Sequence, residues 1–400
     1  MTDQAMKDGI VKRGSTWSYV VRVRDAATGK RHAQWKGGFD TQDDAKAARD
    51  DARVEARKGT SVARAKLTVA EYLEDWQKVW KTQVRPTTMA SYAMHCRVYI
   101  VPRIGGERLQ ELTPAKVEGL YAALQSEAGL SASTVRRVAA TLHKALAGAV
   151  KKKLIPFNPA ASGSVVLPKV DPDDDGVGEL HVWTSAELAK FLDHVREDRL
   201  FPMWRLAAWT GMRRGEVAGL TWRDVDLDDA VVRVQRARVI VSSADVRESK
   251  PKTRKGRRNV DLDVVTVAAL KAWKARQDAE RKVWERTKAG TWPDHGLVFT
   301  LEDGTPLNPA HVSRAFGRHV SGAGKDVPRI RLHDLRHTHA SLLLAAGVPV
   351  KVVSERLGHA TPGFTMNVYQ HVIPGQQRDH LQRVADAAEV KRPKLRVANA

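Results

Sequence analysis

The chain shows two patterns of hydrophobic residues, a period of two and a helical period. The period of two comes first and covers only a short segment. Near the beginning, large apolar side chains occupy every second position, at Trp17, Tyr19, Val21 and Val23. This period of two predicts a half-buried strand. Arg22 and Arg24 lie on its other face, which is therefore partly basic and a candidate DNA contact. Thr28-Gly29 predicts a turn into a second strand through Trp35.

A helix is expected to follow these strands. Gly37-Gly38 ends the second strand, and Thr41 with Asp44 forms a variant capping box that opens an Ala-rich helix. The helix runs to about Lys58-Gly59. One helix on a tiny sheet buries little surface, so this unit suits DNA docking better than catalysis.

From Leu67 to about Pro159 the pattern becomes helical. After Ser131, apolar residues recur at steps of three or four, at Val135, Val138, Leu142, Leu146 and Val150. They predict one buried face of a long helix. Arg85-Pro86 begins another helix with Thr87 or Thr88 near the cap, and Pro114 begins a third. We expect about four or five helices in this region.

Basic side chains lie away from the buried face of the long helix. They are Arg136, Arg137, His143, Lys144, Lys151, Lys152 and Lys153. These residues are candidate contacts for phosphates. A solvated helix face explains any single lysine among them equally well.

Residues 161–180 show no hydrophobic period. Ser162-Gly163-Ser164, Pro168 and the acidic run from Asp171 to Asp175 predict a linker that serves as a solubilising spacer. Thr184 and Glu187 then form a capping box. The domain that starts there is expected to hold the chemistry and to end near residue 387, before a loose basic tail.

Composition indicates the partner. The 400 residues include 67 Lys and Arg against 46 Asp and Glu, a formal net charge of +21. Such a chain favours a polyanion, and neutralising its phosphates releases counterions, so we expect nucleic-acid binding that weakens steeply with salt. The alternative, a basic but otherwise ordinary soluble enzyme, would explain a smaller excess of positive charge better than this one. With 42% hydrophobic residues, the chain can build real cores.

Cysteine content and hydropathy indicate a cytoplasmic protein. Cys96 is the single cysteine of the sequence, so neither a disulfide framework nor a Cys-based zinc site is expected. The N-terminus lacks an apolar core, and no apolar run approaches the roughly 20 residues that cross a bilayer.

The residues of the last domain suggest phosphate chemistry. Arg213 lies in Thr-Gly-Met-Arg-Arg-Gly-Glu, and His333, Arg336, His359 and Tyr369 follow in that order. A phosphodiester under attack gathers negative charge, and guanidinium groups hold such oxygens by two-point hydrogen bonds. Tyr369 is the only tyrosine in this domain. As nucleophile it would form a covalent ester that keeps the energy of the broken bond.

The order and spacing of these motifs resemble the tyrosine recombinase family, specifically phage-type integrases. The resemblance implies a multidomain chain, mainly α with small β elements. Its parts would be an arm-type ββ(β)α DNA-binding module in residues 1–62, a helical SAM-like core-binding domain in 66–160, a linker in 161–180, a catalytic domain with the tyrosine-recombinase fold in 181–387, and a basic tail in 388–400.

The resemblance also implies a role for each catalytic residue. Arg213 and Arg336 clamp the scissile phosphate, His333 transfers protons, His359 hydrogen-bonds the phosphate, and Tyr369 attacks it. His333 and Arg336 are three residues apart, so a helix or turn brings both to one face.

Two neighbours of Arg213 have different expected roles. Glu216 lies on the same helix face, where an ion pair would orient the Arg213 guanidinium. Arg214 points elsewhere on any helix and is expected at the surface or at the DNA backbone.

The family's catalytic lysine lies on a hairpin, usually just before a threonine. The sequence from residue 248 reads Glu-Ser-Lys-Pro-Lys-Thr-Arg-Lys-Gly-Arg-Arg, which matches this lysine to Lys252, the proton donor to the leaving 5′ oxygen. Lys250 and Lys255 remain rivals, and Arg254 is a candidate DNA contact. A solvated basic hairpin is the structural alternative.

His337 and His339 lie beside the catalytic set and invite a metal interpretation. No cysteine or carboxylate lies at the sequence spacing from these histidines that metal ligands usually show, and the neighbouring arginine would repel a cation. Packing and helix capping explain both histidines better. We therefore expect no metal and no other cofactor.

The sequence predicts a site-specific recombinase that cleaves and rejoins DNA through a 3′-phosphotyrosyl intermediate, integrating or excising a phage genome or another mobile element. The family implies a homotetramer on two double-stranded attachment sites in the bacterial cytosol, with an accessory DNA-bending or directionality protein as a further candidate partner. A type IB topoisomerase and a catalytically silent DNA-binding regulator remain alternatives.

Overall fold

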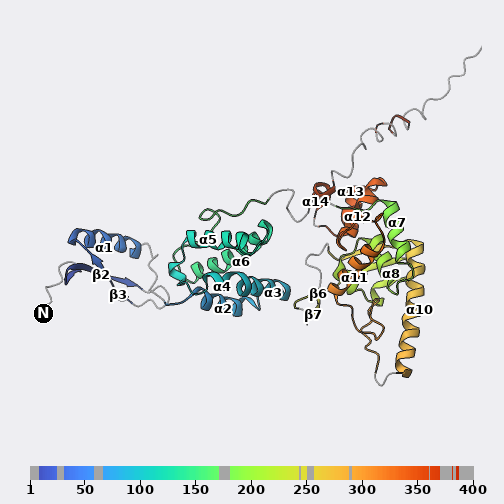
Figure 1. Ribbon diagram of the computed structural model, residues 1–400, viewed down its shortest axis with the longest axis horizontal. Coiled ribbons are helices and arrows are strands. Elements are labelled where there is room, and N and C mark those ends of the chain that lie inside the picture. Colours follow the sequence, from blue (N-terminus) through green and yellow to red (C-terminus); the bar gives the residue numbers. More distant parts are fainter. Residues whose placement is uncertain are drawn as a thin grey trace, which may run out of the picture. The chain divides into compact units, whose positions relative to one another are not determined.

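The computed structural model describes residues 9–24, 31–57, 66–170, 181–242, 245–249, 256–287, 291–359, 361–369, 381 and 384–386. The chain divides into two compact units, residues 1–177 and 178–400. Figure 1 shows the helices and strands of both, coloured along the sequence. Among the described residues, no helix is both long enough and apolar enough to cross a bilayer.

The N-terminal module is a small antiparallel sheet with one helix. Its elements are β1 (Ile10–Arg13), β2 (Thr16–Arg24), β3 (Arg31–Phe39) and α1 (Gln42–Arg57), and the strand order is β1-β2-β3. Tyr19 and Val21 of β2 are buried with Ala45 of α1, as their alternation predicts. The Thr41 hydroxyl accepts the backbone N–H of Asp44 at 3.1 Å and caps α1.

The sequence analysis was wrong about two details of this sheet. It missed β1, whose four residues are too few for a clear period. It also ended the second strand at Gly37-Gly38, whereas β3 continues through both glycines to Phe39. Pairing with β2 keeps this stretch in the sheet, because Ser18 lies opposite Gly37 and Trp17 opposite Phe39. The expected turn at Thr28-Gly29 lies outside the described residues.

Helices form the rest of the first unit. They are α2 (Val69–Trp80), α3 (Pro86–Met94), the π-helical segment η1 (His95–Ile100), α4 (Val101–Ile104), the 3-10 turn η2 (Leu109–Glu111), α5 (Pro114–Ser126) and α6 (Ala132–Lys151). Ser131 caps α6, and the predicted apolar face of that helix enters the core. The cap of α3 is Arg85, not Thr87 or Thr88, because Pro86 already occupies the first helical position.

The second unit has helices before and after a run of short strands. Its elements are α7 (Ser185–His194), α8 (Phe201–Thr210), α9 (Arg214–Ala218), η4 (Trp222–Asp224), β4 (Val225–Asp226), β5 (Val231–Val234), β6 (Ala237–Ile240), β7 (Val246–Ser249), β8 (Arg258–Asp261), α10 (Val264–Thr287), α11 (Pro309–Gly322), α12 (Asp334–Ala345), α13 (Val350–Leu357) and α14 (Pro362–Tyr369). The strands form two small sheets, β4-β5-β8 and β6-β7.

Aromatic side chains fill the core of this unit. Trp183, Phe191, Trp204 and Phe316 are buried and pack ring against ring at centroid distances of 4.9 to 6.0 Å. Burying each such side chain stabilises the fold by roughly 1.5 to 3 kcal/mol. Thr184 and Glu187 form the predicted capping box at the start of α7.

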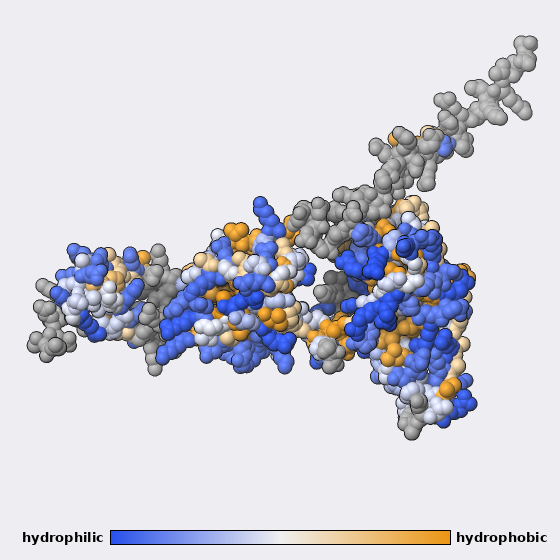
Figure 2. Space-filling view, viewed as in Figure 1, coloured by the Kyte–Doolittle hydropathy of each residue, from blue (hydrophilic) through white to orange (hydrophobic). Residues whose placement is uncertain are grey.

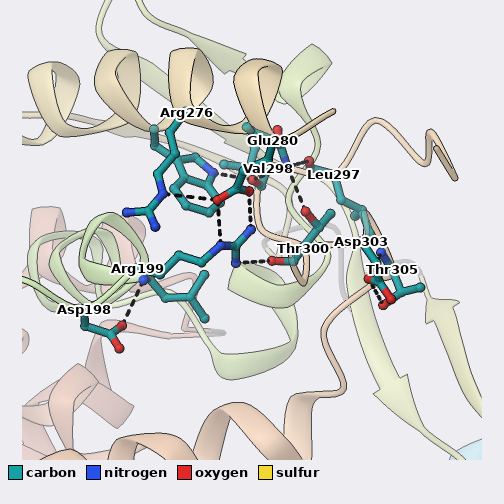
Figure 3. Close-up of polar contacts among 12 residues, drawn as sticks. Asp198, Arg199, Arg276, Glu280, Leu297, Val298, Thr300, Asp303 and Thr305 are labelled. Carbon is teal, nitrogen blue, oxygen red and sulfur yellow. Dashed lines mark hydrogen bonds and ion pairs between the residues drawn. The ribbon is translucent and has the colours of Figure 1, made fainter. Parts of the chain in front are cut away.

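A partly buried ion pair fixes the long helix α10, as Figure 3 shows. Arg199 donates to both carboxylate oxygens of Glu280, at 2.9 and 2.6 Å, and to the Thr300 carbonyl at 2.8 Å. Arg276 adds a hydrogen bond to Glu280 at 3.1 Å. The network therefore joins α10 both to the segment before α8 and to the chain near residue 300.

Candidate active site

The turn between α8 and α9 presents the first arginine. Gly211 ends α8 with a left-handed backbone (φ 60°), and Arg213 then caps α9 in an extended conformation. The Arg213 backbone N–H donates to Glu216 Oε2 at 2.8 Å, and Arg213 Nη1 donates to Glu216 Oε1 at 3.0 Å. The Arg213 side chain stays 42% exposed while that of Glu216 is 4% exposed. The ion pair expected from their spacing is present.

Arg258 is a member of this site that the sequence analysis missed. Its Nη1 and Nη2 donate to Glu216 at 3.2 and 2.9 Å, and its Nε donates to the Arg356 carbonyl at 2.6 Å. Burial acts to raise the pKa of Glu216, but the hydrogen bonds and charge of Arg258, and then Arg213, outweigh it and lower that pKa. A strand period of two could have found Arg258, because buried Val260 follows two residues later.

Arg336 lies at the centre of the unit, 3% exposed. It donates to the Gly211 carbonyl at 2.7 Å and to the Leu357 carbonyl at 2.6 Å, so it joins the last turns of α8 and α13. Burial, followed by the charges of Arg213 and Arg258, lowers the pKa of Arg336 to about 9. The guanidinium is therefore still charged at neutral pH, and a bound anion would stabilise it.

A cleft of about 670 Å³ opens beside Arg213. Its lining includes Arg213, Arg214 and His333, together with Gly215, Ser313, Phe316, Gly317, Ile330, Arg331 and Leu332. Desolvation and then the charge of Arg336 lower the pKa of His333. Arg214 is exposed on the same cleft, where it donates to Ser313 Oγ at 2.9 Å.

His359 follows the left-handed Gly358 (φ 69°) that ends α13. Its Nδ1 lies 2.8 Å from the Thr365 hydroxyl of α14, and its ring packs edge-on against Phe364. Burial, and then the charges of Arg336 and Arg213, lower the pKa of His359 to about 3. A neutral imidazole is therefore held between α13 and the helix that ends at Tyr369.

Tyr369 is fully buried, at 0% exposure. Burial raises the pKa of its phenol to about 12, against the opposing effect of Arg336. Its hydroxyl lies 2.7 Å from Nδ1 of His337. The sequence analysis gave His337 a packing or capping role and missed this contact, although His337 stands one helical turn beyond His333 and their rings are 5.2 Å apart.

His339, the other histidine weighed as a metal ligand, is buried and accepts a hydrogen bond from Arg356 Nε at 3.1 Å. Burial and the charge of Arg356 lower its pKa to about 3. Within the part of the chain that the structure describes, no three His, Cys, Asp or Glu side chains group as a metal site would require.

The predicted hairpin is described only in part. The run between β7 and β8 carries Lys250, Lys252, Arg254 and Lys255, and all four lie outside the described residues. The sequence analysis also missed β7, whose residues Val246 and Ser249 are separated by two charged ones. The described ends of β7 and β8 nevertheless leave the lysine candidates on the connection that leads into Arg258.

The remaining DNA-binding candidates belong to the first unit. Arg22 is exposed on β2, the strand that also contains Arg24. Six candidates on or just after α6 are exposed, namely Arg136, Arg137, His143, Lys151, Lys152 and Lys153. Lys144 is half-buried, and its ammonium lies 4.4 Å from the centre of the Trp80 ring. Hydrophilic residues cover much of the face shown in Figure 2.

Three family models match successive parts of the chain. Residues 182–375 match the phage integrase family, residues 9–55 an arm DNA-binding domain, and residues 68–125 the N-terminal SAM-like domain of phage integrases. The chain belongs to the phage integrase family of tyrosine recombinases, enzymes that cleave and rejoin DNA. The mainly helical catalytic fold, the SAM-like domain and the arm module expected from the motifs are confirmed.

Individual relatives agree with this assignment. The chain is 28% identical over 360 residues to a XerC-like tyrosine recombinase of Caldanaerobacter subterraneus subsp. tengcongensis, covering 86% of this chain and 90% of that one. It resembles the Tn1549 transposon integrase bound to transposon right-end DNA (TM-score 0.63, 20% identity, 80% of this chain and 100% of that one). It also resembles a lambda integrase tetramer bound to a Holliday junction (TM-score 0.55, 16% identity, 91% and 96%). The two solved structures share its fold.

Proposed function

We propose that this protein exchanges DNA strands at specific attachment sites, using Tyr369 as nucleophile and Arg213 and Arg336 as the clamps of the scissile phosphate. One observation carries the proposal. Arg213, the pair His333 and Arg336, His359 and Tyr369 come from four segments, and contacts among those segments gather them in one unit. The family match favours a recombinase over a type IB topoisomerase or a silent regulator.

The chemistry follows from the groups present. Tyr369 Oη attacks phosphorus, the 5′ oxygen leaves, and a 3′-phosphotyrosyl ester remains. Arg213 and Arg336 stabilise the charge on the non-bridging oxygens, while His333 and His359 position the phosphate and move protons. Lys252 is proposed to protonate the departing 5′ oxygen. Attack by a 5′ hydroxyl of the partner strand reverses the step without ATP, because the ester retains the bond energy.

Burial of the nucleophile adds one requirement. Tyr369 is fully buried, so a phosphodiester reaches its hydroxyl only when part of the packing around the tyrosine opens while the contact with His337 is kept. The tyrosine packs with Ala340 and Leu344 of α12 and with Val353 and Leu357 of α13. These contacts leave α14 tied to the same helices that hold Arg336 and His359.

The assembly is proposed from the family. Four copies would act on two double-stranded attachment sites, as in the tetramer named for lambda integrase. An accessory DNA-bending or directionality protein is a further proposed partner. Integration or excision of a mobile element in a bacterial host would place the protein in the cytosol, at the nucleoid.

A nicked suicide substrate tests the nucleophile. The wild-type protein should form a covalent protein–DNA adduct that survives a denaturing gel, and Tyr369→Phe should form none. Tyr121→Phe is the matched control, because among the described residues the buried Tyr121 hydroxyl has no hydrogen-bond partner. An adduct with Tyr369→Phe would refute the assignment. Recombinant product from two attachment sites, against relaxation alone, distinguishes exchange from topoisomerase action.

A further inference from the structure

The hydroxyl of Tyr369 has a nitrogen base beside it. His337 Nδ1 lies 2.7 Å from Tyr369 Oη, within hydrogen-bond reach of the proton that must leave when the oxygen attacks. His333, to which the family resemblance assigns proton transfer, packs edge-on against the ring of His337, with the ring centroids 5.2 Å apart. The histidine in contact with the nucleophile is thus not the one that the motif suggests.

We propose that His337 is the general base for Tyr369. As the Oη–P bond forms, the Oη–H proton moves to His337 Nδ1 and the 5′ oxygen leaves with its bonding electron pair. In the rejoining step, His337 returns the proton to Tyr369 Oη as the phosphotyrosyl bond breaks. This assignment rests on the proposed function, because it requires Tyr369 to be the nucleophile.

At pH 7 the surroundings of His337 keep its imidazole neutral but weaken it as a base, an effect that the negative charge of a bound phosphodiester would offset by raising its pKa. Burial, followed by the positive charge of His333 when protonated, lowers the pKa of His337 to about 4, and Arg336 and Arg331 act in the same direction. Asp334 opposes them. The imidazole is therefore neutral at pH 7. In the tautomer with the proton on Nε2, Nδ1 accepts the hydrogen bond from the phenol.

The same environment explains why a base is needed. The phenol has a pKa of about 12 because it is buried, so very little of it is ionised at neutral pH. The charge of Arg336 favours the phenolate but does not offset the effect of burial. A neutral imidazole in hydrogen-bond contact removes the proton during attack and avoids forming a free phenolate beforehand.

His337→Asn and His337→Gln test the assignment, because an amide keeps a hydrogen bond to Tyr369 but cannot take up its proton. We expect adduct formation on the nicked substrate to slow by about 100-fold or more, with unchanged affinity for intact duplex. His295→Asn, an exposed histidine that makes no contact with Tyr369, is the control. Thermal unfolding is measured for both His337 variants. The cleavage assay then uses the variant whose unfolding matches that of the wild type.

A 5′-bridging phosphorothiolate substrate locates the defect. The thiolate of this substrate leaves without needing a proton. The substrate therefore restores cleavage to variants that cannot protonate the leaving group, but not to variants that cannot activate the tyrosine. The His337 variants should remain slow on it. Rescue by sulfur would place His337 at the leaving group and overturn the assignment.

The contact between His337 and Tyr369 has an alternative explanation, in which His337 only holds the tyrosine in its buried position. If His337 only kept Tyr369 buried, its replacement would leave adduct formation unchanged or make it faster, and either result overturns the proposal. Failure of the proposed function looks different, since Tyr369→Phe would then still form the adduct. The two hypotheses can therefore fail separately.

Discussion

Arg258 holds Glu216 through both carboxylate oxygens, at 3.2 and 2.9 Å, although the two residues are 42 positions apart. Their side chains are only 5% and 4% exposed. Glu216 in turn binds the half-exposed Arg213. Arg213, the proposed phosphate clamp at the start of α9, is thereby tied to β8, the strand that follows the lysine-bearing connection. A buried carboxylate between two arginines fixes the direction in which Arg213 can point.

Glu216→Gln should affect both stability and cleavage. The substitution leaves Arg258 buried without its counter-charge, and breaking a buried pair in this way costs about 3 kcal/mol of unfolding free energy. It also releases the Arg213 guanidinium, so adduct formation should slow by about tenfold or more. Urea unfolding and the nicked-substrate assay measure the two effects.

Glu280→Gln is the matched control for that substitution. Glu280 also binds an arginine, Arg199, at 2.9 and 2.6 Å, in a pair that is partly buried, but neither residue lines the cleft. We expect a comparable loss of stability with an unchanged cleavage rate under conditions where the variant is folded. Equal loss of cleavage in both variants would show that Glu216 acts through stability alone.

Gly211→Ala should disturb the buried arginine. Gly211 adopts φ 60°, and a Cβ there would lie 2.7 Å from Leu357 Cδ2 and 2.9 Å from His339 Cδ2. The left-handed backbone and these close approaches should cost about 1 to 3 kcal/mol. Because the Gly211 carbonyl accepts from Arg336, adduct formation should also fall.

Gly317→Ala provides the contrast. A Cβ at Gly317, within α11, would meet no atom within 4 Å, so alanine should stabilise that helix by about 0.5 to 1 kcal/mol. Thermal unfolding of both variants gives the comparison. A Tm for Gly211→Ala at or above that of the wild type would contradict the steric explanation.

Acid should destabilise the catalytic unit through its buried histidines. The pKa values of His337, His339 and His359 are lowered to about 4, 3 and 3, below the ordinary value of about 6.5. Between those values the unfolded chain binds more protons than the folded one, so stability is complete above about pH 6.5 and is lost as pH falls toward 4.

His339→Gln isolates one part of that effect. Glutamine can still accept from Arg356 Nε but does not titrate. The Tm of this variant should fall less steeply than that of the wild type between about pH 6.5 and 4. Parallel Tm curves for the two proteins would mean that His339 contributes nothing to the acid sensitivity.

A basic stripe on α6 should contribute to the salt dependence of DNA binding. Arg137, Lys144 and Lys151 recur every seven residues and so lie near one line along the helix. If each contacts a phosphate, replacing Arg137 or Lys151 by alanine should lower the slope of log K against log salt by about 0.9. Fluorescence anisotropy with duplex DNA over a salt series measures the slope.

Lys78→Ala is the control for the stripe. Lys78 is an exposed residue of α2 that pairs with Glu74 at 3.0 Å and with Asp75 at 3.1 Å. Its removal should leave the slope unchanged. A slope that drops equally for Lys78 and Arg137 would indicate a general charge effect with no defined contact surface.

Local spacing in the sequence determined much of this protein. The alternation in β2, the capping box at Thr184 and Glu187, and the ion pair of Arg213 with Glu216 all involve residues within a few positions of one another. Such contacts depend on the helical or strand period and can be read from the chain. The ordered motifs likewise identified the family and its nucleophile candidate.

Only the tertiary structure decided which distant groups meet. Arg336 reaches the Gly211 carbonyl over 125 positions, Arg258 reaches Glu216 over 42, and His337 reaches Tyr369 over 32. No local period encodes these separations, because they depend on how α8, α12, α13 and β8 pack around a shared core. Burial in that packing also makes these histidines neutral and the tyrosine hard to ionise. The sequence supplied the candidate reacting groups, and the fold placed the imidazole of His337 beside the hydroxyl of Tyr369.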